Sequence, residues 1–402
     1  MRLFVWARLP EGGIAHAGEL ATTAADLQGH FDAEFEYAAA WLDRSAGFDL
    51  DPASLPRNAR GARHRARGFI PPLGIFGDAL PDAWGRRLLR LKVGADGDRS
   101  DPGLLAALGA GGLGALAFAP PSEPPAAPSA APAQSLRELL EAAADLERGA
   151  LPDGHRFRRL LEGPTPGGAR PKALVHDEGT QWIAKFPSRD DGPHDVVGLE
   201  AVCMALASEA GIQVPATRLV RVGTRRALLV ERFDVTAPGG RRHMVSFRLP
   251  LKESPGRQAL AYGELADAIR RYSASPVEDQ ARLYRQMAFN AAIGNVDDHS
   301  KNFAMIRDVG GWRLSPAFDL LPDHVERREH ALAFLDGYAA PTRAQLLAVA
   351  RQWKVASAEA HIGAVLAAVR AFRRAAARLG VAGGPAFDRI AADIERRIGL
   401  LT

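Results

Sequence analysis

The order of apolar runs between Gly163 and Asp234 constrains the fold more than any other feature of this sequence. Short runs typical of strands are KALVHD, QWIAKF, TRLVRVG and RRALLVERF. A longer run of helical length, DVVGLEAVCMALASEAG, lies between the second and the third. After about residue 261 the chain is helix-rich, apart from a β-like segment around 303–314. A small sheet followed by many helices predicts the α+β class.

Length and composition divide the 402 residues into four segments, because one ordinary core does not extend over such a chain. Residues 1–118 are predicted to form a β-rich N-terminal subdomain, with a strand at MRLFVWARL and a helix at LPDAWGRRLLRLKV. The Pro/Ala-rich stretch 119–135 is typical of a semi-rigid linker. Segments 136–235 and 236–402 are predicted to be a small lobe and a helical lobe.

Several classes of protein are disfavoured by composition. The single cysteine, Cys203, excludes an internal disulfide and suits a reducing compartment. No Cys/His cluster indicates zinc, and no G-x-S-x-G motif indicates a hydrolase. No signal peptide and no apolar run of membrane-spanning length is evident, so we expect a cytoplasmic protein without membrane contact. The net charge of +4 is small for this length and does not indicate nucleic-acid binding.

The segment NVDDHSKNFAMI, followed by LSPAFDLLP, carries the strongest chemical signal. Asp297 and Asn302 are five residues apart, and Asp319 follows after a turn containing Gly310 and Gly311. Phosphoryl transfer needs a carboxylate beside the attacking hydroxyl and oxygen ligands for Mg²⁺. Protein kinases use this order of residues. The pattern predicts Asp297 as the catalytic base and Asn302 and Asp319 as metal ligands.

Three further side chains of this segment have alternative readings. Asp298 is a rival base, and the five-residue spacing selects Asp297 instead. Lys301 is placed to meet the transferred phosphate, and His299 to brace the loop or contact the nucleotide. The plainer alternative is a polar loop that ends a helix and carries a solvated pair of aspartates.

A glycine-containing turn precedes the first strand of the small lobe. In GPTPGGARPKALV, Gly167 and Gly168 allow close approach of the backbone to a ligand, and Arg170 and Lys172 add positive charge. The segment lacks the Walker A pattern and the G-x-G-x-x-G pattern of kinases, so an ordinary Gly/Pro turn remains the alternative.

Two strand ends complete the predicted nucleotide site. Lys185, at the end of QWIAKF, resembles a phosphate-binding strand lysine, and Glu200 on the next helix is its candidate ion-pair partner. In LLVERFD, backbone groups of Glu231 and Phe233 are placed to pair with adenine, and Asp234 with the ribose. A surface lysine and an ordinary strand exit are the alternatives.

The stretch RNARGARHRARG, which runs from Arg57 to Arg67 and then Gly68, is strongly basic. A binding patch for nucleic acid or a partner is one reading. A solvated loop is the other, and we favour it because charge runs usually face water.

The motifs in this order resemble the HipA family of serine/threonine kinases, the toxins of type II toxin–antitoxin modules. The resemblance to its kinase core lies in GGARPKA, LVERFD, DDHSKNFAMI and AFDLLP, and FEYAAAWL and FGDALPDAWGRRLL resemble its N-terminal subdomain. The resemblance implies a two-lobed, protein-kinase-like fold with a small N-terminal β-rich subdomain and a helical C-terminal lobe.

The same resemblance implies ATP and Mg²⁺ as cofactors. Asp297 would be the catalytic base, Asn302 and Asp319 would hold Mg²⁺, Lys185 would bind the ATP phosphates, and His299 would lie near the nucleotide. Family members are often switched off by phosphorylation of a serine in the glycine loop. The aligned residue here is Thr165, which makes it the candidate autophosphorylation site.

The implied partner is a helix-turn-helix, HipB-like antitoxin, with operator DNA contacted mainly through it. The implied action is growth arrest by phosphorylation of a translation-related protein such as an aminoacyl-tRNA synthetase. One alternative is an antitoxin-binding transcriptional corepressor with little kinase activity. Another is a kinase of a small hydroxylated molecule, since fold alone does not select the substrate.

Overall fold

A computed structural model gives the structure of most of the chain. It describes residues 1–57, 60–121, 124–126, 131–150, 154, 160–161, 170–236, 239–251, 260–335, 337–381 and 383–402. Two compact units are present. The first unit comprises Met1–Ser188, Glu231–Ser254 and Ile306–Val309, and the second comprises Arg189–Val230, Pro255–Met305 and Gly310–Thr402. Each unit is assembled from separate segments of the chain, whereas the four predicted segments are consecutive.

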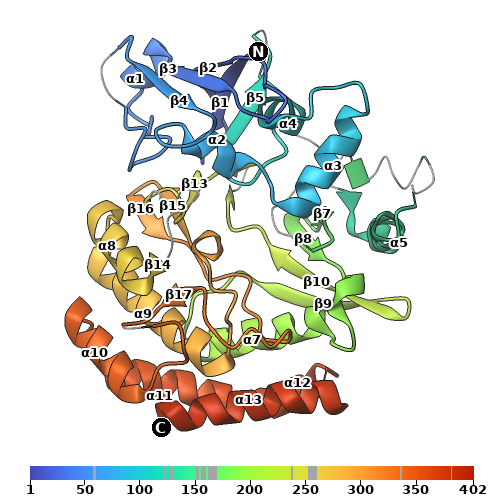
Figure 1. The fold of residues 1–402 in the computed structure, drawn as a ribbon, viewed down its shortest axis with the longest axis vertical. Helices are drawn as coiled ribbons and strands as arrows, with labels where there is room; N and C mark the ends of the chain where they lie inside the picture. Colours follow the sequence, from blue (N-terminus) through green and yellow to red (C-terminus); the bar gives the residue numbers. More distant parts are fainter. Residues whose placement is uncertain are drawn as a thin grey trace. The chain divides into compact units, whose positions relative to one another are not determined.

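The first unit contains a five-stranded antiparallel sheet in the order β4-β3-β2-β1-β5 (Figure 1). Its strands are β1 (Arg2–Arg8), β2 (Ile14–Thr22), β3 (Asp32–Tyr37), β4 (Arg63–Arg67) and β5 (Leu116–Ala119). Along β1, Leu3, Val5 and Ala7 are buried while the residues between them are partly exposed, as the period of two along a strand requires. Strand β1 confirms the prediction for MRLFVWARL.

Four helices of the first unit follow or interrupt these strands: α1 (Ala39–Asp43), α2 (Gly74–Ala79), α3 (Ala83–Val93) and α4 (Asp101–Leu108). Helix α3 confirms the helix predicted in LPDAWGRRLLRLKV, and it buries Trp84, Leu88 and Leu89 on one face. The spacing of these residues by four and one matches the apolar stripe of an amphipathic helix.

Residues Arg63–Arg67 of the basic stretch form strand β4, where we favoured a loop, but the Arg63 and Arg65 side chains are solvated as expected, with 58% and 71% of their surface exposed. Arg65 Nε lies 2.5 Å from Glu34 Oε2, and Arg63 Nε lies 3.2 Å from Glu36 Oε2. These acids lie on β3, which pairs with β4 in antiparallel register. The charge pattern of β3, acidic at alternate positions, accounts for the outcome because it neutralises the facing arginines across the sheet.

The rest of the first unit contains a helix, a 3₁₀ turn and further short strands. These elements are β6 (Ala131–Pro132), the 3₁₀ turn η1 (Ala133–Ser135), α5 (Leu136–Glu147), β7 (Lys172–Asp177), β8 (Thr180–Lys185), β11 (Val235–Thr236), β12 (Gly240–Arg241) and β13 (Met244–Ser246). Strands β7 and β8 confirm the strands predicted in KALVHD and QWIAKF, and they pair antiparallel. The end of the predicted linker is more than a spacer, because β6 pairs in parallel with β7.

The second unit begins with η2 (Arg189–Asp191) and α7 (Val196–Glu209), followed by the hairpin of β9 (Thr217–Val222) and β10 (Arg225–Glu231). Leu228 and Val230 of β10 pack against Val197 and Ala201 of α7. Helix α7 is apolar on most of its surface, which explains its burial and that of Cys203. Burial raises the pKa of the Cys203 thiol.

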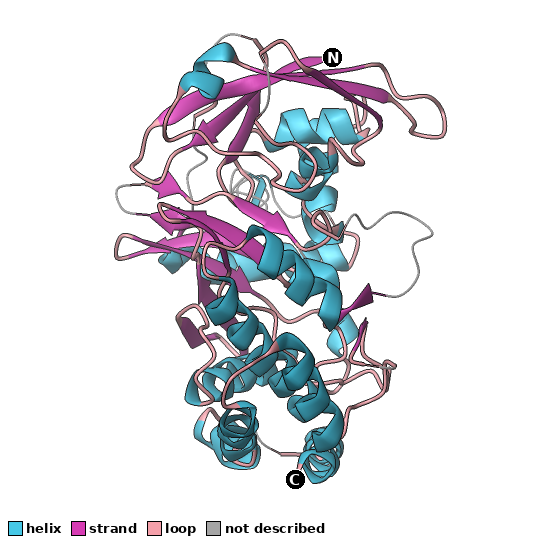
Figure 2. Cartoon of the chain, turned by 90° about the vertical axis from the view of Figure 1, so that its left-hand side faces the viewer, coloured by secondary structure: helices cyan, strands magenta, loops and turns pink. Residues whose placement is uncertain are grey.

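Helices dominate the remainder of the second unit (Figures 1 and 2). They are α8 (Tyr262–Tyr272), α9 (Pro276–Ile293), α10 (Arg343–Trp353), α11 (Ala358–Val369), α12 (Phe372–Arg378) and α13 (Pro385–Leu401). Helix α9 packs against α8, α11 and α13. None of the helices among the described residues is long and apolar enough to cross a membrane.

Short strands and a 3₁₀ turn lie between α9 and α10: η3 (Ser300–Asn302), β15 (Ala304–Asp308), β16 (Gly311–Leu314) and β17 (Leu332–Ala333). The last of these pairs in parallel with β14 (Leu260–Ala261). Strands β15 and β16 confirm the β-like segment predicted around 303–314. The mixture of helices and small sheets confirms the α+β class.

Candidate active site

The buried helix α9 ends at Gly294, and this end positions the predicted catalytic loop. Gly294 has a φ of +71°, the left-handed conformation that ends helices and that glycine adopts without strain. A side chain at this position would also clash, since a Cβ atom would lie 2.8 Å from Arg397 Nε. The Gly294 carbonyl oxygen accepts a hydrogen bond of 2.7 Å from the Asp323 N–H. The loop 295–302 therefore starts from a well-defined point.

Asp297 and Asp298 are neighbours with opposite environments. The Asp298 side chain is fully buried, whereas 54% of the Asp297 side chain is exposed. Asp298 Oδ2 accepts hydrogen bonds from Tyr262 Oη at 2.6 Å and from His330 Nδ1 at 2.9 Å. Asp298 Oδ1 accepts from the backbone N–H of Ala331 at 2.8 Å. A carboxylate held by so many donors anchors the loop and does not serve as an accessible base, which agrees with the choice of Asp297.

The Asp297 carboxylate forms an ion pair with the guanidinium of Arg327. Its backbone carbonyl accepts a hydrogen bond of 2.7 Å from Asn302 Nδ2. The side-chain amide of Asn302 must donate through its nitrogen, because a carbonyl oxygen only accepts. The orientation leaves Asn302 Oδ1 as an oxygen donor for a metal ion. The structure thus brings Asp297 and Asn302 together.

Asp319 lies in the same unit, after strand β16. The segment before Asp319 lies beside the end of the loop, because Ser315 N donates a hydrogen bond of 2.9 Å to the carbonyl oxygen of Ala304. Asp319 is half-buried and has a φ of +57°. Non-glycine residues in this conformation are uncommon and cluster at functional sites.

The other predicted residues of this loop are less exposed. Lys301, within η3, and His299, which precedes it, are both half-buried, and the His299 carbonyl accepts from Asn302 N at 2.9 Å. The roles of both side chains stay predictions. Glu200 is buried on α7 with only 5% of its surface exposed.

In the first unit, Lys172 and Lys185 are directly opposite each other on β7 and β8. Residues that pair in this way present their side chains on the same face, about 5 Å apart. Lys172 is buried and its carbonyl accepts from Trp84 Nε1 at 2.9 Å, while Lys185 is half-buried. Two lysine side chains on one face of a strand pair suit a strongly anionic ligand such as a polyphosphate.

In the segment that follows β10, the environment of Asp234 differs from the predicted ribose-binding role. The Asp234 side chain is buried, and its oxygens accept from Arg232 Nε at 2.9 Å and from Gly114 N at 2.8 Å. Burial alone would raise the pKa of Asp234, but Arg232 and Arg241 outweigh it and lower the pKa. This geometry argues against the ribose contact, because both carboxylate oxygens are already bound.

Glu231 and Phe233 are half-buried. The Phe233 carbonyl accepts from Arg242 Nη1 at 2.9 Å. Their predicted contact with adenine stays a prediction. The glycine turn residues Gly167 and Gly168 and the candidate autophosphorylation site Thr165 lie outside the described residues.

Sequence reasoning missed the residues that hold Asp298. Tyr262 and His330 donate hydrogen bonds to it, and Asn290 Nδ2 in turn donates to Tyr262 Oη at 3.0 Å. Arg397 contacts His330 Nε2 from helix α13, at 3.3 Å. These residues are separated by tens of positions in the chain, and no local motif connects them.

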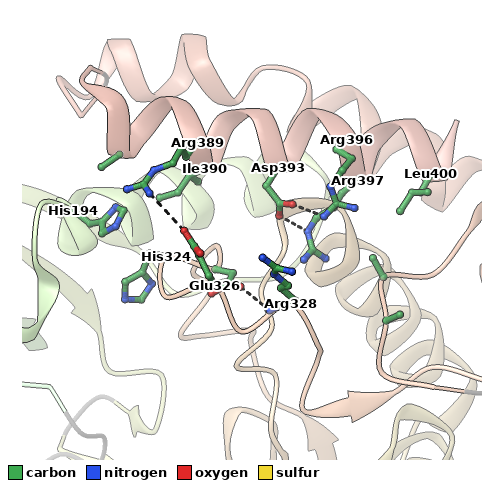
Figure 3. A pocket seen from close by; sticks show the side chains of 14 residues that line it. His194, His324, Glu326, Arg328, Arg389, Ile390, Asp393, Arg396, Arg397 and Leu400 are labelled. Carbon is green, nitrogen blue, oxygen red and sulfur yellow. Dashed lines mark hydrogen bonds and ion pairs between the residues drawn. The ribbon is translucent and has the colours of Figure 1, made fainter.

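The second unit also contains a pocket of about 660 Å³ (Figure 3). Its side chains come from helix α13 and from the segment around 323–340, with His194 contributed by the segment before α7. Asp393 and the buried Arg397 form part of its wall, and Arg389 faces Glu326 across it at 3.6 Å. Asp297, Asn302 and Asp319 are not among the lining residues.

Comparisons with known proteins agree with these features. Residues 165–377 match the HipA-like C-terminal domain, and residues 13–119 match the HipA N-terminal domain. The putative kinase Y4mE of Sinorhizobium fredii is 30% identical over 323 residues, 73% of this chain and 72% of the relative. The serine/threonine-protein kinase toxin HipA of Shewanella oneidensis is 25% identical over 322 residues, 72% of this chain and 70% of the relative.

A solved structure is similar over almost the whole chain. It is the complex of HipA, HipB and operator DNA from Shewanella oneidensis, with a TM-score of 0.69 and 21% identity, covering 98% of this chain and 95% of the matched one. The fold is therefore of the α+β, protein-kinase-like class, as predicted. The chain belongs to the HipA family of kinases, and its function is kinase-like.

Proposed function

We propose that this chain is an ATP- and Mg²⁺-dependent serine/threonine protein kinase of the HipA toxin type. The observation that carries the proposal is the contrast between the two adjacent aspartates. Asp298 is buried and anchored, and it leaves Asp297 exposed next to Asn302, whose amide holds the Asp297 backbone. A carboxylate in this setting is accessible to a substrate hydroxyl.

Asp297 would accept the proton of the attacking hydroxyl. The hydroxyl oxygen forms a bond to the γ-phosphorus, the bond to the β–γ bridging oxygen breaks, and ADP leaves. Lys301 would stabilise the charge of the transferred phosphoryl group. Lys172 and Lys185, on one face of the β7–β8 pair, support binding of the nucleotide phosphates in the first unit.

The oxygen donors available suit Mg²⁺. Asn302 Oδ1 and the Asp319 carboxylate are hard ligands, and Mg²⁺ takes its other positions from substrate phosphates and water. No group of three or more His, Cys, Asp or Glu residues that would hold a metal occurs among the described residues. When bound, the ion would neutralise phosphate charge.

The proposed setting is a toxin–antitoxin module in the cytoplasm. The related Shewanella structure contains HipB and operator DNA. By analogy, the partner proposed here is a helix-turn-helix antitoxin, through which operator DNA is bound. The proposed target is a protein of translation, such as an aminoacyl-tRNA synthetase. Ion pairing of Arg63 and Arg65 with Glu34 and Glu36 weakens the main sequence support for direct DNA binding as the principal role, because it partly neutralises the basic stretch.

The test is transfer of labelled γ-phosphate from ATP to proteins of a bacterial lysate, with and without Mg²⁺. The wild type should label one or a few proteins on serine or threonine, identified by mass spectrometry. Asp297→Asn and Asp319→Asn should abolish labelling.

Asp267→Asn is the matched control, because the Asp267 side chain is 66% exposed on α8 and forms a surface ion pair with Arg270 of the same helix. It should label as the wild type does. Absence of both ATP binding and transfer by the wild type would refute the proposal. If only small molecules were labelled, the substrate would be a hydroxylated small molecule and not a protein.

A further inference from the structure

A continuous chain of polar contacts leads from helix α13 to the proposed catalytic loop. Arg397 Nε donates to Asp393 Oδ2 at 2.6 Å. Arg397 Nη1 lies 3.3 Å from His330 Nε2, and His330 Nδ1 lies 2.9 Å from Asp298 Oδ2. Asp298 is the residue next to Asp297. The outer end of this chain forms part of the wall of the pocket in Figure 3.

The chemistry of arginine determines which atoms donate and which accept in this series of contacts. A guanidinium group has donors and no acceptor, so His330 Nε2 must be the acceptor in its contact with Arg397. The ring proton of His330 is then on Nδ1 and is donated to Asp298. Arg397 thereby selects the tautomer of His330 that can hold Asp298.

Burial makes this arrangement specific. The relative exposure is 2% for Arg397, 3% for His330 and 0% for Asp298. A buried guanidinium is costly unless it is fully paired. The backbone accommodates Arg397 through Gly294, where a Cβ atom would lie 2.8 Å from Arg397 Nε. The loop start and the Arg397 guanidinium therefore share one closely packed site.

We propose that Arg397 and His330 are positioning residues that hold Asp298 and so orient Asp297 for phosphoryl transfer. The inference rests on the proposed function and extends it to helix α13. This helix lies outside residues 13–119 and 165–377, which match the two family domains. The motifs of the kinase core therefore do not include these side chains of α13.

The helix offers a matched pair of variants for the test. Arg397→Met removes the donor to His330 and keeps most of the side-chain volume. Arg396→Met is the control, because Arg396 also donates to Asp393 but its side chain is 59% exposed. Arg397→Lys keeps a donor near His330. His330→Phe removes both ring nitrogens and keeps the ring beside Phe334, whose centroid lies 4.9 Å away.

The expected result is a selective loss of kcat. Misplacement of a catalytic group typically lowers the rate by roughly 10- to 100-fold. We expect such a loss for Arg397→Met and for His330→Phe, with the KM for ATP changed less than about twofold, because the bound substrate is not contacted. Arg397→Lys should recover part of the rate, and Arg396→Met should match the wild type.

A second measurement does not depend on activity. Hydrogen exchange of the peptides covering 295–302 and 328–335 reports on the backbone N–H groups of Ala331 and Leu332, which donate to Asp298. These amides should exchange faster in Arg397→Met and His330→Phe than in Arg396→Met, at a temperature where circular dichroism shows all the proteins folded.

Each outcome has a separate meaning. Equal kcat and equal exchange in folded Arg397→Met and Arg396→Met would overturn the inference, and so would loss confined to the KM. If Arg397→Met does not fold, Arg397→Lys and His330→Phe decide by the same criteria. An inactive wild type would refute the proposed function, and the exchange comparison would then decide whether Arg397 holds the loop.

Discussion

The guanidinium of Arg327 binds Oδ1 of Asp297, the carboxylate that we propose as the catalytic base. Both side chains are about half exposed, at 52% and 54%. Arg327 follows Asp319 by eight residues in a segment with two non-glycine residues at positive φ, Glu326 and Arg328. The base is therefore accessible to water but already paired.

Replacing Arg327 by alanine should accelerate phosphoryl transfer. An exposed ion pair contributes about 1 kcal/mol at most, which corresponds to about fivefold in rate. We expect kcat/KM for a protein substrate to rise by up to this factor, because the carboxylate is released for the hydroxyl. The difference should shrink at high salt, which screens the pair.

Arg328→Ala is the control for this prediction, since Arg328 lines the pocket of Figure 3. It should leave kcat/KM unchanged. A fall in kcat/KM on removal of Arg327 would contradict the prediction and would show that Arg327 assists substrate binding.

Substitutions of the two adjacent aspartates should have different effects: loss of Asp298 should lower stability, and loss of Asp297 should abolish activity. Asp298→Ala leaves Tyr262 and His330 without their buried acceptor, and breaking such a site costs about 3–5 kcal/mol. Asp297→Ala removes only an exposed pair and should change stability by less than about 1 kcal/mol while abolishing transfer. Urea unfolding and the labelling assay measure the two effects. Equal destabilisation by both changes would count against the anchoring role of Asp298.

His243 should make the first unit sensitive to acid. Burial lowers the pKa of His243 to about 4, although the Leu50 carbonyl, 2.8 Å from Nε2, opposes the shift. In the unfolded chain the pKa is about 6.5, so between about pH 6.5 and pH 4 only the unfolded state binds this proton. The free energy of unfolding should therefore decrease by up to about 3 kcal/mol as the pH is lowered from about 6.5 to 4.

His243→Gln removes this titration and keeps a donor for Leu50. Urea unfolding at pH 7 and pH 4.5 should show a smaller loss of stability for the variant than for the wild type. An identical loss in both proteins would show that His243 does not titrate as its burial implies.

The paired arginines of β4 should contribute little to DNA binding. We expect the chain alone to bind duplex DNA only in the non-specific range, with a Kd of about 10⁻⁴–10⁻⁶ M at physiological salt. The double change of Arg63 and Arg65 to glutamine should leave the salt dependence unchanged, because Glu34 and Glu36 already neutralise both groups. Fluorescence anisotropy at several salt concentrations measures the slope. A slope reduced by about two would show that both arginines contact phosphate.

Features carried by neighbouring residues could be predicted from the sequence. Helix α3 and strands β1, β7 and β8 follow from local apolar patterns. The proximity of Asp297 and Asn302 was also predictable, because the two residues are only five positions apart in one loop. The same spacing selects Asp297 over Asp298 as the predicted base, although it carries no information on the burial of either side chain.

The remaining features depend on residues that are distant in the sequence. Strand β4 is stabilised by pairing with β3, about 30 positions earlier in the sequence. The Asp234 carboxylate accepts a hydrogen bond from the backbone N–H of Gly114, which is 120 positions away. The contact of Arg397 with His330 spans 67 positions. Composition and spacing specify local conformation and chemical type, whereas burial and partners of a polar side chain are set when distant segments pack together. That packing assigns Asp298 to the interior, leaves Asp297 exposed and brings helix α13 to the proposed catalytic loop.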